Sequence, residues 1–414
     1  MGFFNPLLAV IAAIAFLIIL IYKRVNLGIA LNATALFLAL LAVDLAKIPV
    51  VIYETTVDLP TVSVVLATFC IMLLSQLYKE TGIIDRLSES IGRLINNPKA
   101  VLMVLPAVIG LLPVAGGALM SAPLVEKEAE KLQMKPDRKA YVNLWFRHTV
   151  FPVYPLSPVI ITTTLLTGVS IPLIIMRQIP VAIVMAVVGY VIGFRNTVLS
   201  GKKEQSADQS RNRNLRDLLV SFSPILTTIA VAIALSLGGV KLLNGFDVVV
   251  AIIIGLIIMI AVTRLRFKVF TKPFKTWGIY GITFAAYGAF LLRNVMINVG
   301  ISNVFSSFMT NGSMDLVLFL AVAPAVLGLL TGSPAGGVAV SISILSGLLT
   351  MPFAPKVAAL IYISSYLGYT IAPTHLCFTF TADYFKCSLG RMYRYVLPSF
   401  LVTFPIGILV YFLL

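Results

Sequence analysis

The chain has 414 residues, of which 59% are hydrophobic and only 11% are charged, and its mean hydropathy is +1.01. Because soluble domains are roughly 45–50% apolar and about 25% charged, this composition excludes an ordinary soluble protein and indicates a multi-pass protein of the cell membrane. The net charge of +15 falls mostly in six short loops, so we expect anionic lipid on the cytoplasmic face as its partner, and no nucleic acid.

The basic loops also predict the path of the chain, because the positive-inside rule places all six on the cytoplasmic side. The N-terminal stretch lacks a basic region and a small-residue cleavage site, so we interpret it as a retained span rather than a signal peptide. The first half, residues 1–200, is expected to start outside and end inside. Its expected elements are spans at 3–22, 25–45 and 59–78, a hairpin at 99–131, a broken helix at 140–168 and a span at 173–194.

Three of the predicted elements in this half are not simple spans. Residues 83–95 place isoleucine and leucine opposite charged residues, which predicts an amphipathic helix on the cytoplasmic surface. Residues 99–131 begin and end at cytoplasmic charge, but the arms on either side of 113–117 are too short to cross a bilayer, so we expect a re-entrant hairpin. Three prolines interrupt the next helix and predict a discontinuous one: Pro152, Pro155 and Pro158.

A polar cytoplasmic linker at 201–217 separates the halves. Because the first half crosses the membrane an odd number of times, the second half, 218–414, is expected to repeat its elements upside down and to end outside. The expected elements are spans at 218–238, 246–263 and 276–296, a surface helix at 300–309, a hairpin at 315–350, a broken helix at 355–385 and a span at 390–413. The predicted fold is an all-α integral membrane protein with about ten transmembrane helices, two re-entrant hairpins and two inverted-topology repeats.

A repeated segment supports this duplication. Residues 105–112 (LPAVIGLL) recur at 323–330 (APAVLGLL), with six identities in eight positions, so that 105 corresponds to 323 at an offset of 218. Each copy runs into Ala-Gly-Gly, at 115–117 and at 335–337. Broken apolar segments at corresponding positions of two halves are the best sequence indicator of the binding site of a secondary transporter.

The breaks contain residues suited to binding small ions. Ser333 before Pro334 and Ser157 before Pro158 predict the N-caps of new helices, and Thr374 is a weaker signal of the same kind. Half-helices that start inside the membrane direct N–H groups towards an anion, and those that end there offer carbonyl oxygens to Na⁺. The expected substrate-binding residues are Gly116, Gly117, Ser157, Ser333, Gly336, Gly337, Thr374, His375 and Arg293. The expected ligands of a coupling Na⁺ are Thr331, Ser333, Ala115 and Ser121. The alternative is that the glycines only allow close helix packing.

Four charged or titratable residues lie near the breaks, and two of them, His375 and Arg293, have two interpretations each. His375 either contacts a substrate carboxylate or takes a coupling proton, or it is satisfied by a neighbouring carbonyl. Arg293 either attracts an anion or extends to the outer interface. Arg147 and His148 are interpreted first as interfacial residues. Because no carboxylate falls near the expected midplane, the sequence argues against a cationic substrate.

With two inverted halves, each containing a hairpin and a broken helix, the chain resembles the ion transporter superfamily, which includes citrate, gluconate, lactate, dicarboxylate and arsenite carriers. It looks most like an uncharacterised prokaryotic family within that superfamily. Sodium-dicarboxylate members carry Ser-Asn-Thr at both hairpin tips, and of the corresponding positions here only Ser333 keeps a matching residue type. The resemblance implies an elevator mechanism and a homodimer.

The sequence thus favours a secondary active transporter of a small organic anion, coupled to Na⁺ or H⁺, with no other cofactor. The alternative is a passive channel for anions or small solutes. An intramembrane enzyme is not expected, since the chain has no HExxH, no GxSxG and no paired intramembrane carboxylates.

Overall fold

The computed structural model describes residues 5–112, 117–197, 211–237, 246–300, 315–345 and 351–414, and all regular secondary structure within these ranges is helical. Residues 5–197 form α1 (Pro6–Tyr22), α2 (Leu27–Ala42), α3 (Ile48–Val57), α4 (Leu59–Glu80), α5 (Ile83–Leu94), α6 (Pro98–Gly110), α7 (Ala118–Glu130), α8 (Pro136–Thr149), the 3-10 turn η1 (Phe151–Val153), α9 (Pro158–Thr167) and α10 (Ile171–Phe194).

The rest of the chain forms α11 (Arg211–Leu237), α12 (Phe246–Thr263), α13 (Phe267–Phe270), the 3-10 turn η4 (Pro273–Lys275), α14 (Trp277–Val299), α16 (Leu316–Thr331), α17 (Pro334–Leu345), α18 (Pro355–Thr370), α19 (Leu376–Tyr384) and α20 (Leu389–Leu413). Seven helical segments of the described residues are long and apolar enough to cross a membrane. The chain is therefore a membrane-embedded, all-helical protein. The surface helix expected at 300–309 lies outside the described residues.

The ends of several helices follow directly from local sequence. Asn5, Asn26, Asp58, Asn97 and Asp315 each accept a hydrogen bond from a backbone N–H of the helix that follows, which satisfies a donor with no partner inside the helix. Proline stands in the first turn of many helices, where its missing N–H costs nothing. These are local signals, so a reader of the sequence can find the helix starts without knowing the fold.

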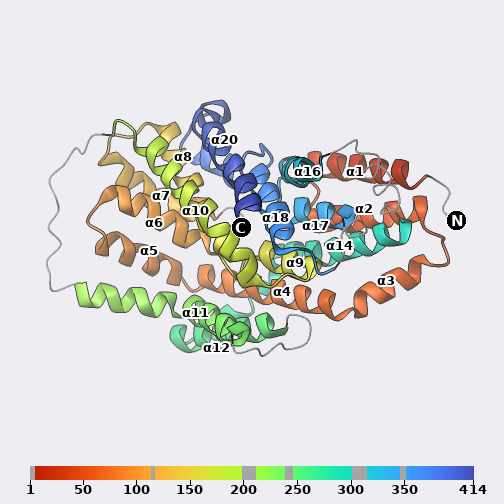
Figure 1. Cartoon of the computed structure of the whole chain (residues 1–414). Helices are drawn as coiled ribbons and strands as arrows, with labels where there is room; N and C mark the ends of the chain where they lie inside the picture. The colour runs from red at the N-terminus through yellow and green to blue at the C-terminus, as the bar shows by residue number, and fades with distance from the viewer. Residues whose placement is uncertain (1–4, 113–116, 198–210, 238–245, 301–314, 346–350) are drawn as a thin grey trace.

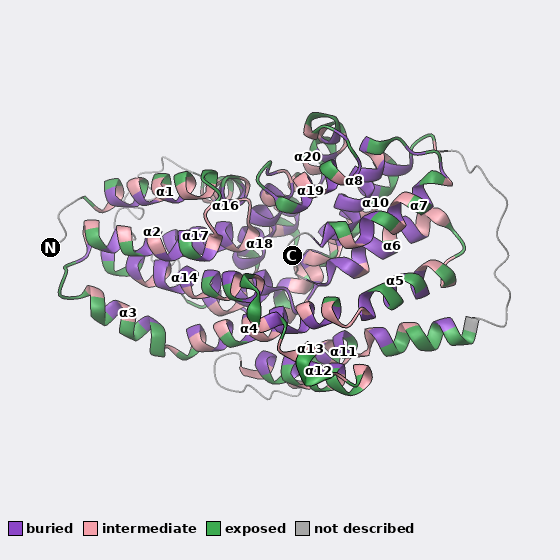
Figure 2. Ribbon diagram, turned by 180° about the vertical axis from the view of Figure 1, so that it is seen from behind, coloured by how far each residue is buried: buried purple, intermediate pink, exposed green. Residues whose placement is uncertain are grey.

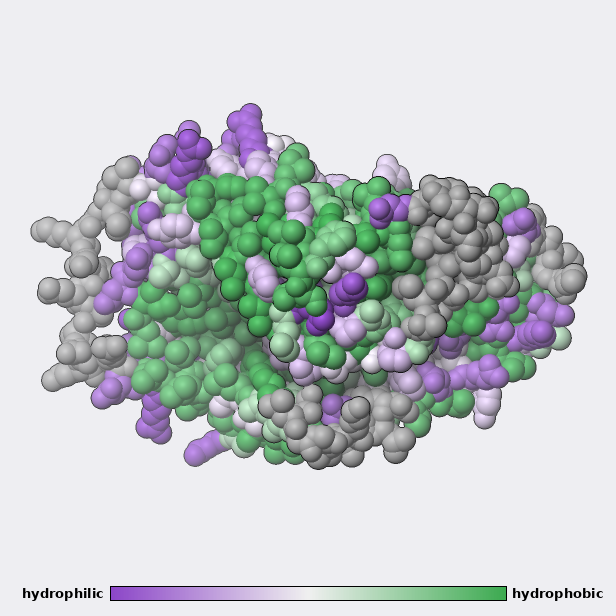
Figure 3. All heavy atoms as spheres, viewed as in Figure 1, coloured by the Kyte–Doolittle hydropathy of each residue, from purple (hydrophilic) through white to green (hydrophobic). Residues whose placement is uncertain are grey.

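Helices from the two halves pack against each other throughout the molecule. In Figure 1, α2 runs beside α14, α4 lies beside α12, and α5 lies beside α11. Figure 2 shows that buried residues line the helices facing the middle of the molecule, while α3 and the far end of α11 are largely exposed. Hydrophobic side chains cover most of the central face in Figure 3, as expected for a surface in contact with lipid.

The amphipathic segment does form a helix, α5, with its apolar face buried. Ile83, Ile84, Leu87 and Ile91 are buried, whereas the charged residues on the opposite face are exposed. The buried face packs against α6 and α11. Protein therefore covers the apolar side of this helix.

The offset of 218 found in the sequence recurs in the helix bounds. Helices α4, α9 and α10 begin at residues 59, 158 and 171, and α14, α19 and α20 begin at 277, 376 and 389. Packing recurs as well. A Cβ atom at Gly110 would overlap the carbonyl oxygen of Arg147, and one at Gly328 would overlap that of Ser365. Since both pairs are related by the offset, the two halves bring the same helices together through the same glycine contact.

Candidate functional site

Four interruptions of helices form the candidate site. Helix α6 is separated from α7, α8 from α9, α16 from α17, and α18 from α19. Residues 113–116 lie outside the described residues, so the expected sites at Ala115 and Gly116 are not placed, and Gly117 is a buried residue next to the start of α7. The remaining breaks can be followed residue by residue.

The tip of the second hairpin is a tight turn between two helices. Helix α16 ends at Thr331, Gly332 has a positive φ of 59°, and α17 begins at Pro334. The Ser333 Oγ accepts the backbone N–H of Gly336 at 3.3 Å, as an N-cap residue does. A Cβ atom at Gly332 would overlap the Thr374 side chain, so this tip contacts the break between α18 and α19.

Two residues at corresponding positions hold the two hairpins. The Arg147 guanidinium (Nη2) donates to the carbonyl oxygen of Leu112, near the end of α6, at 3.0 Å. The Ser365 hydroxyl donates to the carbonyl oxygen of Pro334, at the start of α17, also at 3.0 Å. Positions 147 and 365 differ by the same offset of 218. The broken helices α8/α9 and α18/α19 therefore bind the hairpins directly.

A buried aromatic and imidazole cluster joins the two broken helices. The rings of His148 and His375 are perpendicular, with centroids 4.8 Å apart. The Tyr369 hydroxyl lies 2.6 Å from the Nε2 of His375, and the Tyr366 hydroxyl donates to the backbone oxygen of His148 at 2.7 Å. The Nδ1 of His148 lies 2.7 Å from the backbone oxygen of Leu144, which leaves its Nε2 for the cluster. The structure thus brings residues from the two halves of the chain into direct contact.

Arg147 is a buried cation without a counter-ion among the described residues. Arg147 is only 4% exposed, and its second terminal nitrogen, Nη1, has no hydrogen-bond partner in the described part of the chain. No carboxylate of the described part of the chain lies within ion-pair distance of it. A buried guanidinium that is neither paired nor fully hydrogen-bonded is costly, which makes this position suited to an anionic ligand. The interpretation of Arg147 and His148 as interfacial residues is wrong, because both are buried in the protein.

The cluster also contains metal-ligating side chains. One ligand atom from each of His148, His375 and Cys377 lies within 4.8 Å of the others, and all three residues are buried. Two neutral imidazoles and a thiol would suit a transition metal. However, the charge of Arg147 lies in the same region and no described carboxylate offsets it, so the electrostatics favour an anion over a cation here.

Two of the residues expected to bind Na⁺, Ser121 and Thr331, donate hydrogen bonds to protein groups. The buried Ser121 hydroxyl donates to Asn143 Oδ1 at 2.6 Å, and Asn143 donates in turn to the backbone oxygen of Ala118. The Thr331 hydroxyl donates to the carbonyl oxygen of Leu327 at 2.7 Å. Thr331 and Ser333 lie together at the tip of the second hairpin, whereas Ser121 lies in α7 of the other hairpin. A Na⁺ site there stays a prediction.

The other expected substrate residues fall into different environments. Ser157 precedes α9 but its side chain makes no capping bond, and α19 is preceded by His375 rather than by Thr374, which is exposed. Gly336 faces Leu27 of α2, while a Cβ atom at Gly337 would overlap Ser365. For Gly337 the close-packing interpretation therefore fits the geometry.

Arg293 lies apart from the His148 and His375 rings. It belongs to α14, is half-buried, and is close enough to Asp58 for their charges to interact. The neighbouring Asn294 donates to the Thr55 hydroxyl at 2.9 Å. Arg293 forms no hydrogen bond or ion pair with Ser333 or His375 within the described chain. The charge that acts on Arg293 is therefore that of Asp58, a carboxylate of the first half.

Sequence analysis missed Tyr366 and Tyr369, which contact the two histidines, and Asn143, which contacts Ser121. Tyr366 and Tyr369 lie on one face of α18, and Asn143 and Arg147 on one face of α8, at the three- and four-residue spacings that bring helical side chains together. A polar face on an apolar helix next to a predicted break is a signal that could have identified them.

One family model and two solved structures are similar to this chain. The family model described as "Protein of unknown function (DUF401)" matches residues 5–414. The YdaH transporter of Alcanivorax borkumensis, whose crystal structure is titled as revealing an unusual topology, superimposes with a TM-score of 0.63 at 13% identity, over 89% of this chain and 87% of that one.

Neisseria gonorrhoeae MtrF, whose structure is titled as illuminating a class of antimetabolite efflux pumps, superimposes with a TM-score of 0.53 at 13% identity, over 89% of this chain and 83% of that one. A search of curated proteins gives no match. At this identity the two structures show a shared fold and no more.

Proposed function

We propose that this chain, which belongs to the DUF401 family, is a secondary active transporter of a small organic anion such as a carboxylate. The observation that carries the proposal is the buried guanidinium of Arg147, which has an unused donor and no described counter-ion. A substrate carboxylate would supply the missing charge and accept the free N–H group. The two structural neighbours are described as a transporter and as one of a class of efflux pumps, which is consistent with this class.

The same proposal includes alternating access by an elevator movement of one domain against another. The hairpins, the broken helices, α10 and α20 would move, and α1, α2, α4, α11, α12 and α14 would form the scaffold. The recurring offset of 218 and the shared glycine contacts support two repeats, which inverted topology would relate. The second hairpin packs against α14, and Gly336 lies close to Leu27 of α2, which supports a contact between this hairpin and the proposed scaffold.

Thermal unfolding of the purified protein tests substrate class and coupling ion together. A ligand that binds only the folded state raises the melting temperature, and a concentration of 100 times Kd adds about 2.7 kcal/mol. Organic anions are compared in NaCl and in choline chloride at two pH values. A shift seen only in NaCl identifies Na⁺ as the coupling ion, and a shift in both salts that depends on pH indicates H⁺. No shift with any carboxylate would contradict the proposal, and unsaturable flux in proteoliposomes would support a channel instead.

Replacing Gly336 with leucine is expected to abolish transport with little loss of stability. A Cβ atom at this position would lie 3.3 Å from the Thr331 side chain and 3.4 Å from Leu27 Cδ1, contacts that small shifts can relieve, but a full leucine side chain would extend further towards α2. Uptake into proteoliposomes should fall to background, while the melting temperature changes by only a few degrees.

The adjacent glycine provides the matched control. Gly337→Leu would drive its side chain into Ser365 and the backbone of Gly328, so that variant is expected to lose stability as well as transport. If Gly336→Leu unfolds as readily as Gly337→Leu, Gly336 serves hairpin packing and not movement against the scaffold.

A further inference from the structure

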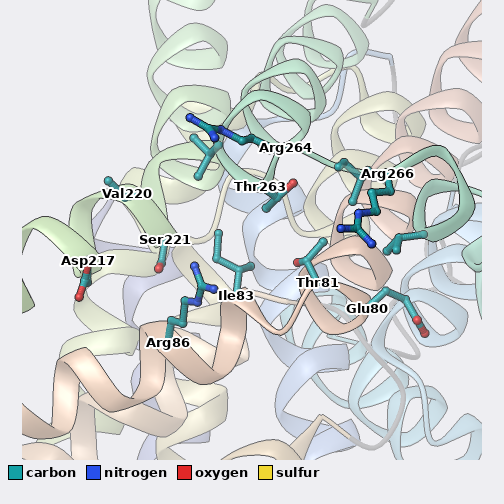
Figure 4. Close-up of a pocket in the computed structure, with 13 residues that line it drawn as sticks. Glu80, Thr81, Ile83, Arg86, Asp217, Val220, Ser221, Thr263, Arg264 and Arg266 are labelled. Atoms are coloured by element: carbon teal, nitrogen blue, oxygen red, sulfur yellow. The ribbon is translucent and has the colours of Figure 1, made fainter.

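A polar cavity lies outside the candidate transport site, where three distant segments meet. The turn between α4 and α5, the start of α11 and the end of α12 line a half-open cavity of about 390 Å³. Its walls include Thr81, Ile83, Arg86, Asp217, Ser221 and Arg266, shown in Figure 4. All three segments belong to or adjoin the loops that the positive-inside rule places in the cytoplasm.

Three arginines make the wall of this cavity positively charged. Arg86, Arg264 and Arg266 line it, and none of them forms an ion pair or a side-chain hydrogen bond with a described residue. Figure 4 shows Arg86 and Arg266 on opposite sides of Ile83 and Thr81. The guanidinium groups are therefore available for a ligand.

The acidic residues of the wall do not neutralise the arginines. Glu80 is directed outward in Figure 4 and forms an ion pair with Lys272 at 3.2 Å. Asp217 lies at the far edge of the cavity and is exposed. With Glu80 engaged by Lys272, the cavity wall contains three guanidinium groups and one other carboxylate, that of Asp217. Guanidinium groups bind phosphate through paired N–H donors, so the chemistry fits a phosphate group.

The helices that lead away from the cavity present apolar side chains to their surroundings. Exposed hydrophobic residues follow α11 and α12 from the cavity end onward: Leu219, Val220, Leu226, Ile233, Ile253, Ile257 and Ile260. A phosphate group held at the cavity would therefore have exposed apolar side chains of α11 and α12 beside it. The acyl chains of a lipid can pack on these apolar side chains, whereas a free phosphate compound has no acyl chain to place there.

We propose that this cavity binds the phosphate-bearing headgroup of an anionic membrane lipid. Its acyl chains lie along α11 and α12. Since these helices are expected to belong to the scaffold, the lipid fixes the scaffold at the cytoplasmic face of the bilayer. This site is separate from the Arg147 cluster, and its occupation requires no transport.

Native mass spectrometry of the detergent-purified protein tests the proposal. Phosphatidylglycerol and phosphatidylcholine with identical acyl chains are added in turn, and bound lipid is measured against lipid concentration. The wild type is expected to bind phosphatidylglycerol at least 10-fold more tightly. The triple variant Arg86→Gln, Arg264→Gln, Arg266→Gln is expected to lose that preference.

A second triple variant removes the same charge elsewhere. Arg24, Lys127 and Arg394 are exposed and lie outside the cavity, and their replacement by glutamine should leave the lipid preference intact. Equal losses in both triple variants would show a general effect of net charge and overturn the proposal. Displacement of phosphatidylglycerol by millimolar inorganic phosphate, without any preference between the two lipids, would identify a soluble phosphate compound as the ligand and also overturn it.

Discussion

Arg147→Gln is expected to weaken binding of the transported anion by about 100-fold, while the ligand-free protein stays at least as stable as the wild type. Loss of a buried charged partner costs about 3 kcal/mol in affinity, which corresponds to roughly 100-fold. The empty protein has no described counter-ion for Arg147, so removing the guanidinium removes a desolvation cost and not an ion pair. Anion-dependent shifts in melting temperature measure both quantities on the same sample.

Two further variants separate binding from folding. Arg147→Lys keeps the charge but not the paired donors, so it should retain part of the affinity. Arg293→Gln removes a charge beside Asp58, away from the two histidines, and should leave affinity unchanged. A large loss of ligand-free stability in Arg147→Gln would mean that Arg147 serves mainly to hold Leu112 and the first hairpin.

Gly110→Val and Gly328→Val are each expected to destabilise the protein by about 3 kcal/mol or more. In both cases the new side chain would overlap backbone atoms of the neighbouring broken helix, at Arg147 and at Ser365. Overpacking against side chains costs roughly 1–3 kcal/mol, and a backbone carbonyl cannot rotate aside as a side chain can. If the halves use the same helix contact, the two variants should lower the melting temperature to a similar extent.

Gly92 is the matched control because it is also helical but has no atom within 4 Å of a Cβ position. Gly92→Ala should raise stability by about 0.5–1 kcal/mol, since alanine is the better helix former. Unfolding is followed by size-exclusion chromatography after heating. A Gly110→Val protein as stable as the wild type would show that α6 and α8 can separate at this contact, and would weaken the argument for equivalent halves.

Most of the fold follows from signals that lie within one helix length. The apolar runs indicate a membrane protein, and the helices that begin at Leu59, Phe246 and Leu389 start within one residue of the predicted positions. Helix α3 was not predicted, because Ile48–Val57 is too short to be recognised as a span. The long apolar helices can therefore be predicted from local sequence, whereas a helix as short as α3 cannot.

Only part of the candidate site could be predicted from such local signals. The predicted turn at Ser333 and the cap of α17 depend on neighbouring residues, and the structure shows both. The spacing of Asn143 and Arg147 could have indicated a polar face next to a break, but it did not show that Arg147 is buried, because charged residues near helix ends commonly reach the membrane interface. Its location depends on where α6 and α8 meet.

The order of residues is enough to establish that this chain is a helical membrane protein, with helices interrupted at Pro and Gly and a segment at 105–112 that recurs at 323–330. Hydrophobicity, capping and proline effects act over one or two turns, so they can be read in order along the chain. Which polar groups meet is set by the packing of helices that are distant in sequence. The Tyr366 hydroxyl reaches His148 from the other half of the chain, and His148 packs on His375 across a still longer separation. Contacts of this range have no local signal, because helix packing alone brings Arg147 and the two histidines to the same buried place.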